Sequence, residues 1–282
     1  MLMRPHGVSL LPKRRKKTMI KTFYNLKTLP FQKDIKPEDI FLSAASRELF
    51  QRLEYMKQNR GIMMITGMPG TGKTLHLRSF VQKLNPNLYK YFYLPLSTVN
   101  TMDFYRQLAM ALAGQAPWKK TELFICIQNS IKDYISNNKK LPVIIFDEAH
   151  LLKHDNFYEL QIISNFEMDS RDPALFILAG QPHLRDKLLN PIHQSFNQRI
   201  ALKFHLTHLS KEETQHYINH QLALAGKKEP LFDQSAIEAI YKNSTGTPRI
   251  INTLVIKCLT LGALEKKELL TQEEVYCASR EL

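Results

Sequence analysis

Residues 67–74 combine three glycines with a lysine and a threonine in the pattern G-x-x-x-x-G-K-[ST]. The glycines allow the backbone to curl so that its N–H groups point at phosphate oxygens, beside a helix N-terminus whose partial positive charge favours anions. In this pattern Lys73 reaches the β- and γ-phosphates of a nucleotide, and Thr74 offers its hydroxyl to Mg²⁺. We therefore expect seven residues of the segment to bind nucleotide: Gly67, Pro69, Gly70, Thr71, Gly72, Lys73 and Thr74.

Two adjacent acids follow the apolar run Val143-Ile144-Ile145-Phe146. A carboxylate at the end of such a strand is the second half of a nucleotide site: Asp147 would bind Mg²⁺, mostly through water, and Glu148 would polarise or deprotonate the attacking water. The letters Asp147-Glu148-Ala149-His150 also spell the box of a helicase class, but the accompanying helicase motifs are absent from the sequence. For His150 the sequence identifies no partner, and we expect a surface or locally hydrogen-bonded histidine.

Alternating strands and helices surround these residues and predict a parallel sheet covered on both faces, a three-layer αβα core of the P-loop type. Short apolar runs mark the strands and amphipathic patterns mark the helices. The expected strands cover residues 62–66, 91–96, 143–146 and 175–179, and the expected helices cover residues 46–57, 102–113, 121–136 and 157–165.

Gln181 follows the fourth expected strand, in the run Gly180-Gln181-Pro182. In a sheet of this kind the ligand lies beyond the carboxyl ends of the strands. Gln181 is therefore a candidate to contact the γ-phosphate or the attacking water.

The pattern changes after about residue 206, where apolar strands give way to helices. Capping boxes at Ser210–Glu213 and Thr271–Glu274 open two of them, and two further helical patterns lie between, near 233–242 and 248–264. We expect a basic, disordered tail over residues 1–18, a nucleotide-binding core over 19–206, and a small all-helical lid over 207–282.

The chain of 282 residues has a formal net charge of +13 and a pI near 9.5, which favours a polyanionic partner such as nucleic acid or an anionic membrane surface. Residues 1–18 contribute six basic residues and no acid, either as an arm that contacts phosphates or as an extension preceding a start at Met19.

Three cysteines without ligand spacing predict free thiols in a reducing compartment. Since no run of 18 apolar residues and no secretory signal occurs, we expect a cytoplasmic protein without an integral membrane segment.

Together these motifs resemble the AAA+ ATPases, in particular the ExeA-like branch that includes transposition ATPases of the TniB and TnsC type. The resemblance runs from about Phe23 to Ala263. Besides the phosphate loop and the acidic strand end, it rests on these segments: Phe23-Tyr24-x-Leu26, Pro30-Phe31, Ala179-Gly180-Gln181-Pro182-x-Leu184, Asn197-Gln198-Arg199-Ile200, Leu209-Ser210-x-Glu212-Glu213-Thr214-x-x-Tyr217-Ile218 and Gly246-Thr247-Pro248-Arg249-Ile250-Ile251-Asn252.

The resemblance implies roles for two arginines. Arg199 matches the arginine finger that reaches the ATP of a neighbouring subunit, which would require a homo-oligomer. Arg249 matches the sensor arginine that contacts nucleotide within its own subunit. A fixed guanidinium stabilises the negative charge that phosphoryl transfer spreads over the γ-oxygens. ATP rather than GTP follows from the resemblance and from the absence of an Asn-Lys-x-Asp guanine signature.

The resemblance also implies partners. ExeA proteins of secretion systems continue into a membrane span and a cell-wall-binding region, whereas this sequence ends after the lid. We therefore expect an ATPase like the shorter relatives, which bind double-stranded DNA as ATP-dependent oligomers and recruit or activate a transposase. The alternatives are a secretion or assembly ATPase that acts on protein partners, and a slow nucleotide switch of the initiator type.

Lys119 and Lys120 are the sequence-level candidates for DNA contact. They follow Trp118 in a segment that joins two expected helices, where they could neutralise phosphates with little sequence specificity. The alternative is an ordinary solvated loop with Trp118 packed inward. Lys139 and Lys140, which precede the third strand, are a weaker candidate pair.

Overall fold

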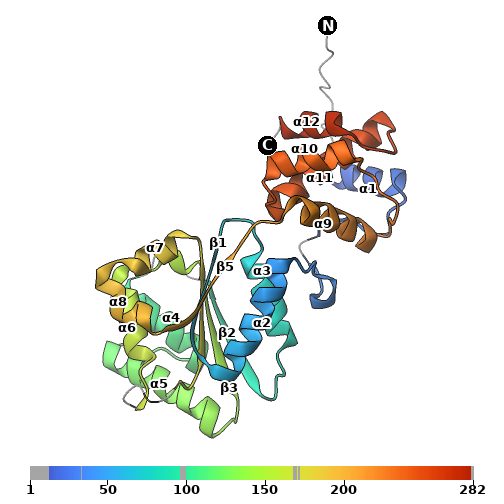
Figure 1. The fold of residues 1–282 in the computed structure, drawn as a ribbon. Helices are drawn as coiled ribbons and strands as arrows, with labels where there is room; N and C mark the ends of the chain where they lie inside the picture. Colours follow the sequence, from blue (N-terminus) through green and yellow to red (C-terminus); the bar gives the residue numbers. More distant parts are fainter. Residues whose placement is uncertain (1–12, 33, 96–99, 168–169, 171, 281–282) are drawn as a thin grey trace. The chain divides into compact units, whose positions relative to one another are not determined.

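The computed structural model describes residues 13–32, 34–95, 100–167, 170 and 172–280, and only the backbone of residues 13–17 (Figure 1). The chain divides into two compact units. The core unit comprises Ala44–Thr207, and the helical unit combines the residues up to Ser43 with His208–Leu282. Residues 19–43, which we expected in the core, therefore belong to the helical unit.

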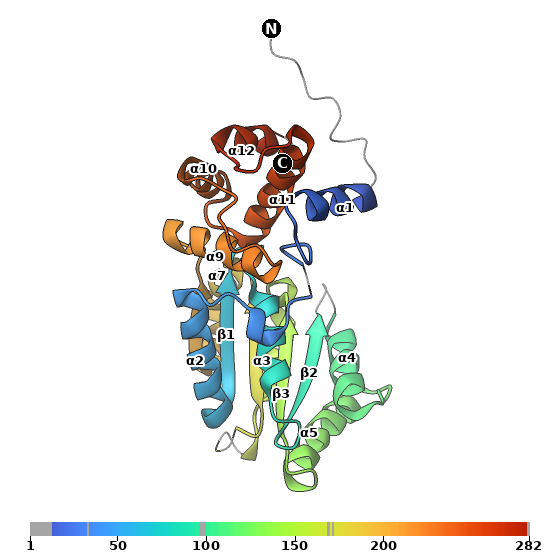
Figure 2. The same ribbon diagram turned by 90° about the vertical axis from the view of Figure 1, so that its right-hand side faces the viewer.

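The core unit is built on a five-stranded sheet in the order β2-β3-β4-β1-β5, with every neighbouring pair parallel. Figure 2 shows β1, β2 and β3 of this sheet. The predicted parallel sheet is thus confirmed. The register aligns the carboxyl ends of the strands, since Thr66 pairs with Gly180, and Pro95 pairs with Asp147. The strands are β1 (Gly61–Gly67), β2 (Tyr89–Pro95), β3 (Leu141–Asp147), β4 (Leu175–Gly180) and β5 (Ile200–Leu206).

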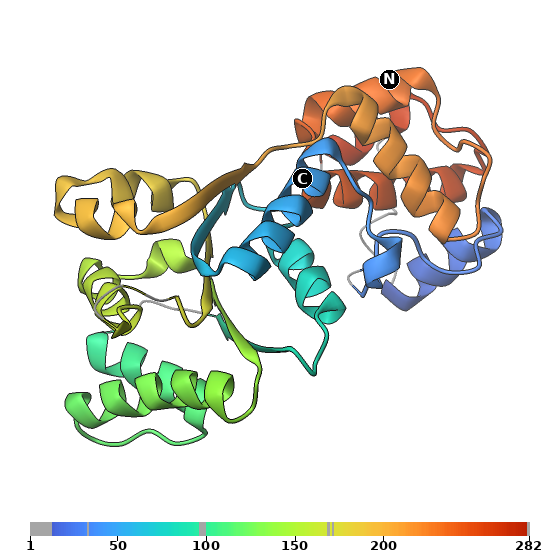
Figure 3. The ribbon, with the colours of Figure 1, turned by 60° about the horizontal axis from the view of Figure 1, so that its bottom comes forward.

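Helices cover both faces of this sheet (Figure 3). The side chains of β1 pack alternately on the two faces of the sheet. Met63 and Ile65 pack with α2 and α3 on one face, and Ile62 and Met64 pack with α4, α5 and α6 on the other. Because helices cover both faces of the sheet, nearly every side chain of its central strands is buried, and these strands are continuous apolar runs in the sequence. The helices are α2 (Ala44–Asn59), α3 (Lys73–Lys83), α4 (Thr101–Ala113), α5 (Lys120–Ser136), α6 (His154–Ile163), α7 (His183–Leu189) and α8 (Gln194–Gln198), with 3₁₀ turns η2 (Ala149–Leu151) and η4 (Pro191–His193).

The helical unit has its own apolar core, to which residues on both sides of the core unit in sequence contribute. Both predicted capping boxes are confirmed: Ser210 with Glu213 opens α9, and Thr271 with Glu274 opens α12. Tyr24 ties the early segment to the late one, because its hydroxyl donates to the carbonyl of Lys267 at 3.2 Å. The elements are α1 (Lys13–Phe23), η1 (Pro37–Asp39), α9 (Lys211–Leu224), α10 (Gln234–Ser244), α11 (Pro248–Glu265) and α12 (Gln272–Ser279).

Several segments differ from the sequence-based expectation. The expected disordered tail is helical from Lys13, while residues 1–12 lie outside the described part of the chain, as does Leu96 at the end of the second expected strand. The strand β5, where apolar and polar residues alternate on one edge of the sheet, was not among the four expected. Within the described residues, no helix combines the length and apolar character needed to cross a membrane.

Candidate nucleotide-binding site

The predicted phosphate loop joins β1 to α3 at the carboxyl edge of the sheet. Gly67 is required by close packing, because a Cβ there would lie 2.8 Å from the carbonyl oxygen of Leu206. Gly70 and Gly72 adopt φ angles of +86° and +99°, in the region that favours glycine. The loop therefore has the geometry that its glycines predict, and it ends at the N-terminus of α3.

Lys73 folds back over this loop. Its ammonium donates hydrogen bonds to the carbonyls of Gly67 at 2.7 Å and Met68 at 3.1 Å, and the residue is only 7% exposed. Thr71 also donates through its hydroxyl to the carbonyl of Met68, at 2.9 Å. The loop thus holds a buried cation beside the backbone N–H groups of a helix N-terminus, an arrangement suited to phosphate groups.

Asp147 connects the loop to the end of β3. Its Oδ2 accepts a hydrogen bond from the hydroxyl of Thr74 at 2.8 Å and another from the hydroxyl of Tyr93 at 2.8 Å. Its Oδ1 accepts from the backbone N–H of Glu148 at 2.9 Å. Sequence reasoning found Thr74 and Asp147 but missed Tyr93, which ends near Asp147 because β2 and β3 are paired in parallel. Burial, followed by the bond to Asp147, raises the pKa of Tyr93 and keeps its hydroxyl protonated.

These oxygens fit a magnesium ion. Mg²⁺ prefers hard oxygen ligands and is usually held by one or two carboxylates, waters and substrate phosphates rather than by a complete protein cage. The Thr74 hydroxyl and the buried Asp147 carboxylate, already in contact, supply such donors. No group of three or more His, Cys, Asp or Glu residues arranged to hold a metal ion occurs in the described part of the chain.

Glu148 projects from the strand end with its side chain 48% exposed and a left-handed φ of 53°. Its Oε2 lies 3.3 Å from Nδ1 of His150, a buried residue that is 5% exposed. The same Nδ1 accepts a hydrogen bond from the backbone N–H of Gln181 at 3.4 Å. The structure therefore brings Glu148 and Gln181 to one histidine, whose pKa burial lowers against the opposing effect of Glu148.

His76 is a second histidine of the site that sequence reasoning missed. From the first turns of α3 its Nδ1 contacts the carbonyl of Gly72 at 2.7 Å, and its Nε2 contacts the hydroxyl of Ser46 at 2.8 Å. Burial lowers the pKa of His76. A neutral ring that donates through Nδ1 and accepts from Ser46 satisfies both contacts, so His76 fixes the end of the loop against α2.

The two arginines implied by the resemblance lie elsewhere. Arg199 directly precedes β5, and its guanidinium donates to the carbonyl of Gln161 at 3.3 Å. The residue that follows it pairs with Ile62 near the amino end of β1, so Arg199 lies at the edge of the sheet opposite the phosphate loop. Arg249 lies exposed in the first turn of α11, in the helical unit.

The segment expected to contact DNA is tied to the core unit. Lys120 forms an ion pair with Glu159 at 2.5 Å, and the hydroxyl of Tyr105 donates to the same carboxylate at 2.7 Å. Lys119 lies 3.8 Å from Glu122. Trp118 does not pack inward, because 84% of it is exposed.

The chain is similar in sequence to several known proteins. Residues 56–188 match the family model described as "AAA domain". The chain is 27% identical over 270 residues to general secretion pathway protein A of Aeromonas hydrophila, covering 94% of this chain and 48% of that protein. It is 24% identical over 220 residues to the replication factor C small subunit of Sulfolobus acidocaldarius, covering 76% and 58% of the two chains. The chain thus spans about half the length of these curated relatives.

Solved structures with the same fold include Drosophila ORC bound to DNA, with a TM-score of 0.64 at 14% identity over 99% of this chain and 68% of that one. Cdc6p from Pyrobaculum aerophilum gives a TM-score of 0.62 at 13% identity over 93% and 70%. At these identities the likeness concerns the fold, which is that of the P-loop NTPases with an AAA domain. Residues 56–188 are thus similar to an AAA domain, and nearly the whole chain is similar to part of general secretion pathway protein A.

Proposed function

We propose that the chain binds Mg-ATP and hydrolyses it at the carboxyl edge of the core sheet. The observation that carries this proposal is the contact between Thr74 and Asp147, which joins the phosphate loop to an acidic strand end with Glu148 beside it. Lys73 and the loop N–H groups bind the phosphates, and Thr74 and Asp147 hold the magnesium ion. The bound ion supplies positive charge that neutralises the phosphate oxygens.

Glu148 is the group that accepts a proton from the attacking water. It is exposed enough to meet that water, while its neighbour Asp147 is buried and engaged by three donors. The carboxylate of Glu148 and the backbone N–H of Gln181 both lie near Nδ1 of His150, so the proposed base lies close to the residue proposed to contact the γ-phosphate. A neutral His150, which its buried position favours, leaves the carboxylate free to take up the proton.

Arg199 acts on the nucleotide of a second copy of the chain. A seven-residue strand at about 3.3 Å per residue separates the two edges of the sheet by about 20 Å, further than an arginine side chain extends. Its position before β5 therefore supports action in trans, within a homo-oligomer. Arg249 is proposed, from the resemblance alone, to contact nucleotide within its own subunit.

Mixing two inactive variants tests this proposal. Glu148→Gln lacks the base and Arg199→Ala lacks the finger, so each alone is expected to lose ATP hydrolysis. In a mixed oligomer a Glu148→Gln subunit can offer its intact Arg199 to the site of an Arg199→Ala subunit, and activity should return. If both variants bind ATP and assemble but the mixture stays inactive, Arg199 does not act in trans.

For the wider role we propose ATP-dependent binding of double-stranded DNA and regulation of a transposase, in a reducing cytoplasm that suits the free cysteines. The net charge of +13 supports a polyanionic partner. A second candidate, an assembly ATPase that acts on proteins, is favoured by the similarity to general secretion pathway protein A.

Equilibrium binding of the full chain to duplex DNA, with and without Mg-ATP, separates these roles. The Glu148→Gln variant is suited to this measurement because it should retain ATP without hydrolysing it. Affinity that rises with Mg-ATP is expected for the transposition role. Absence of DNA binding under both conditions would remove that role and leave the ATPase site as proposed.

A further inference from the structure

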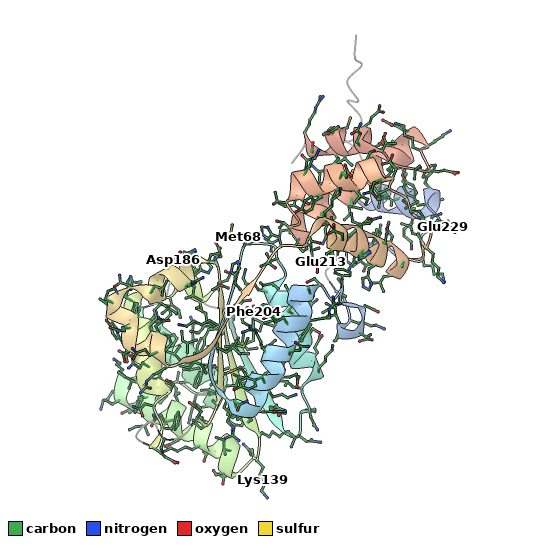
Figure 4. All side chains as sticks on the ribbon, viewed as in Figure 1. Met68, Lys139, Asp186, Phe204, Glu213 and Glu229 are labelled. Carbon is green, nitrogen blue, oxygen red and sulfur yellow. The ribbon has the colours of Figure 1, made fainter. Side chains whose placement is uncertain are left out.

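A pocket of about 570 Å³ lies at the edge of the core sheet opposite the phosphate loop. Four of its lining residues carry cationic side chains, and none of the nine is acidic. The cations are Lys57, Arg60, Lys139 and Lys140; Leu88 and Tyr89 add an apolar and an aromatic surface. Figure 4 shows the separation within this unit, with Met68 of the loop and Lys139 labelled at opposite ends.

Three chain segments that are distant in sequence build this pocket, and each immediately precedes a strand. Arg60 precedes β1, Leu88 precedes β2, and Lys140 precedes β3. Backbone hydrogen bonds hold them in place: the N–H of Leu141 donates to the carbonyl of Leu88, and the N–H of Lys140 to that of Tyr134, both at 2.8 Å. Because parallel strands begin at the same edge of the sheet, the fold itself gathers these cations.

Most of this charge has no ion-pair partner within the part of the chain that the structure describes. Lys57 forms an ion pair with Glu54 and lies 5.6 Å from the ring centre of Tyr89. The side chains of Arg60, Lys139 and Lys140 have no hydrogen bond or ion pair with any residue that the structure describes. Like charges gathered in one concave site repel each other and attract counter-ions.

Two of the pocket's cations have an unusual backbone conformation. Arg60 and Lys139 have φ angles of +65° and +52°, a left-handed conformation that glycine or asparagine adopts at lower cost. Arg60 directly follows α2, at the place where helices commonly end in glycine. Basic residues thus occupy two turns of the pocket where backbone geometry alone favours glycine or asparagine.

We propose that this pocket binds the phosphodiester backbone of double-stranded DNA. The assignment rests on the DNA binding proposed above and locates it at the amino edge of the sheet. Cations on three separate segments match a row of phosphates better than a single phosphate group, and Leu88 and Tyr89 offer surface to the sugars. Since the contacts are to the backbone, the pocket adds affinity with little sequence specificity.

Charge reversal tests the pocket. Lys139→Glu/Lys140→Glu is compared with Lys228→Glu/Lys242→Glu, which makes the same change in net charge at exposed lysines of the helical unit. Each phosphate contact contributes about 0.9 to the slope of log affinity against log salt, so loss of two contacts lowers the slope by about 2 and the affinity at 0.1 M salt by about tenfold to a hundredfold. ATP hydrolysis measured without DNA should be unchanged in both variants.

Each outcome has a distinct meaning. If the wild type binds DNA and the pocket variant binds as well as the control variant, the pocket is not the DNA site, while the proposed DNA binding stands. If the wild type binds no DNA, the proposed DNA binding and this assignment both fail. If pyrophosphate alone raises the melting temperature of the wild type but not of the pocket variant, and DNA does not compete, the ligand is a free phosphate compound and the assignment to DNA is overturned.

Discussion

The carboxyl edge of the core sheet holds its charged groups in a fixed network, whereas three cations at the amino edge have no hydrogen bond or ion pair from their side chains to any described residue. At the carboxyl edge Lys73 is bound by two backbone carbonyls, and both oxygens of Asp147 are engaged. At the amino edge Arg60, Lys139 and Lys140 line an open pocket. The same sheet therefore presents two proposed anion sites of different construction.

A rigid site and a solvated site suit different kinds of ligand. A network of short, buried hydrogen bonds places each group within narrow limits, which suits one nucleotide in one geometry and a reaction that depends on it. Solvated cations interact over the Debye length and lose strength with added salt, which suits a repeating backbone in many registers. Variants at the two edges should therefore affect different measurements.

The largest effect is expected from Glu148→Gln at the carboxyl edge. Removing a general base typically lowers the rate of hydrolysis by about 10²- to 10⁴-fold, and the amide keeps the size of the side chain. Single-turnover ATP hydrolysis measures the loss, and nucleotide binding by fluorescence should stay close to the wild type. Duplex DNA affinity should also persist. A parallel loss of DNA binding would show that the two edges do not function separately.

The sequence allowed the carboxyl edge to be predicted because that site depends on backbone geometry. Glycines that permit positive φ, and a carboxylate at the end of an apolar strand, leave a readable pattern in consecutive residues. The loop of residues 67–74 accordingly joins β1 to α3, and Asp147 ends β3, as the sequence predicts. The alternation of strands and helices in the sequence predicted the parallel sheet. The edge strand β5 was not predicted, because its apolar residues alternate with polar ones and form no continuous apolar run.

Contacts between distant segments could not be predicted. Tyr93 reaches Asp147 only because β2 pairs with β3, and His76 reaches Ser46 only because α3 packs beside α2. The basic pocket draws on three segments that share no motif. The sequence indicated Lys139 and Lys140 only as a weak pair, and the structure adds that Arg60 lines the same pocket. Likewise, no local sequence pattern predicted that residues 19–43 belong to the same unit as the helices α9 to α12.

Tyr93→Phe tests how far the fixed network at the carboxyl edge stabilises the protein. It removes one of the donors to the buried carboxylate of Asp147, and a hydrogen bond to a charged group contributes about 1.5–3 kcal/mol. Because Tyr93 is 44% exposed, we expect the lower end, about 1.5 kcal/mol of the free energy of unfolding. Urea denaturation measures it. Tyr91→Phe, at an exposed position of the same strand, is the matched control and should have little effect; equal losses in the two variants would contradict the role of the bond.

A buried histidine supports the segment that leads to Arg199 at the amino edge. His193 is 1% exposed, and its Nε2 lies 2.7 Å from Nδ1 of His154. Burial, with smaller effects of His154 and Lys187, lowers its pKa. The unfolded chain then binds more protons than the folded one at pH values below about 6.5, so the free energy of unfolding should fall as the pH decreases, by up to about 1.4 kcal/mol per pH unit for this group.

Denaturation of His193→Gln at several pH values checks this expectation. The variant should be less stable at neutral pH and should show a shallower decline of stability toward acid pH than the wild type. His216→Gln, at an exposed position of α9, is the control and should retain the wild-type slope. An unchanged slope in His193→Gln would mean that another group causes the decline.

The smallest effect is expected at Trp118 and Lys119, which the sequence suggested as a DNA contact. Trp118 is 84% exposed, and Lys119 lies near Glu122, so Lys119→Gln should change the free energy of unfolding by no more than about 0.5 kcal/mol. Its salt slope for DNA binding should stay closer to the wild type than that of Lys139→Gln, because the carboxylate of Glu122 already offsets part of its charge. Trp118 is the sole tryptophan of the chain, so its fluorescence gives a local readout. A strong fluorescence change on DNA addition, together with a lowered salt slope for Lys119→Gln, would move the DNA site from the amino edge to this loop.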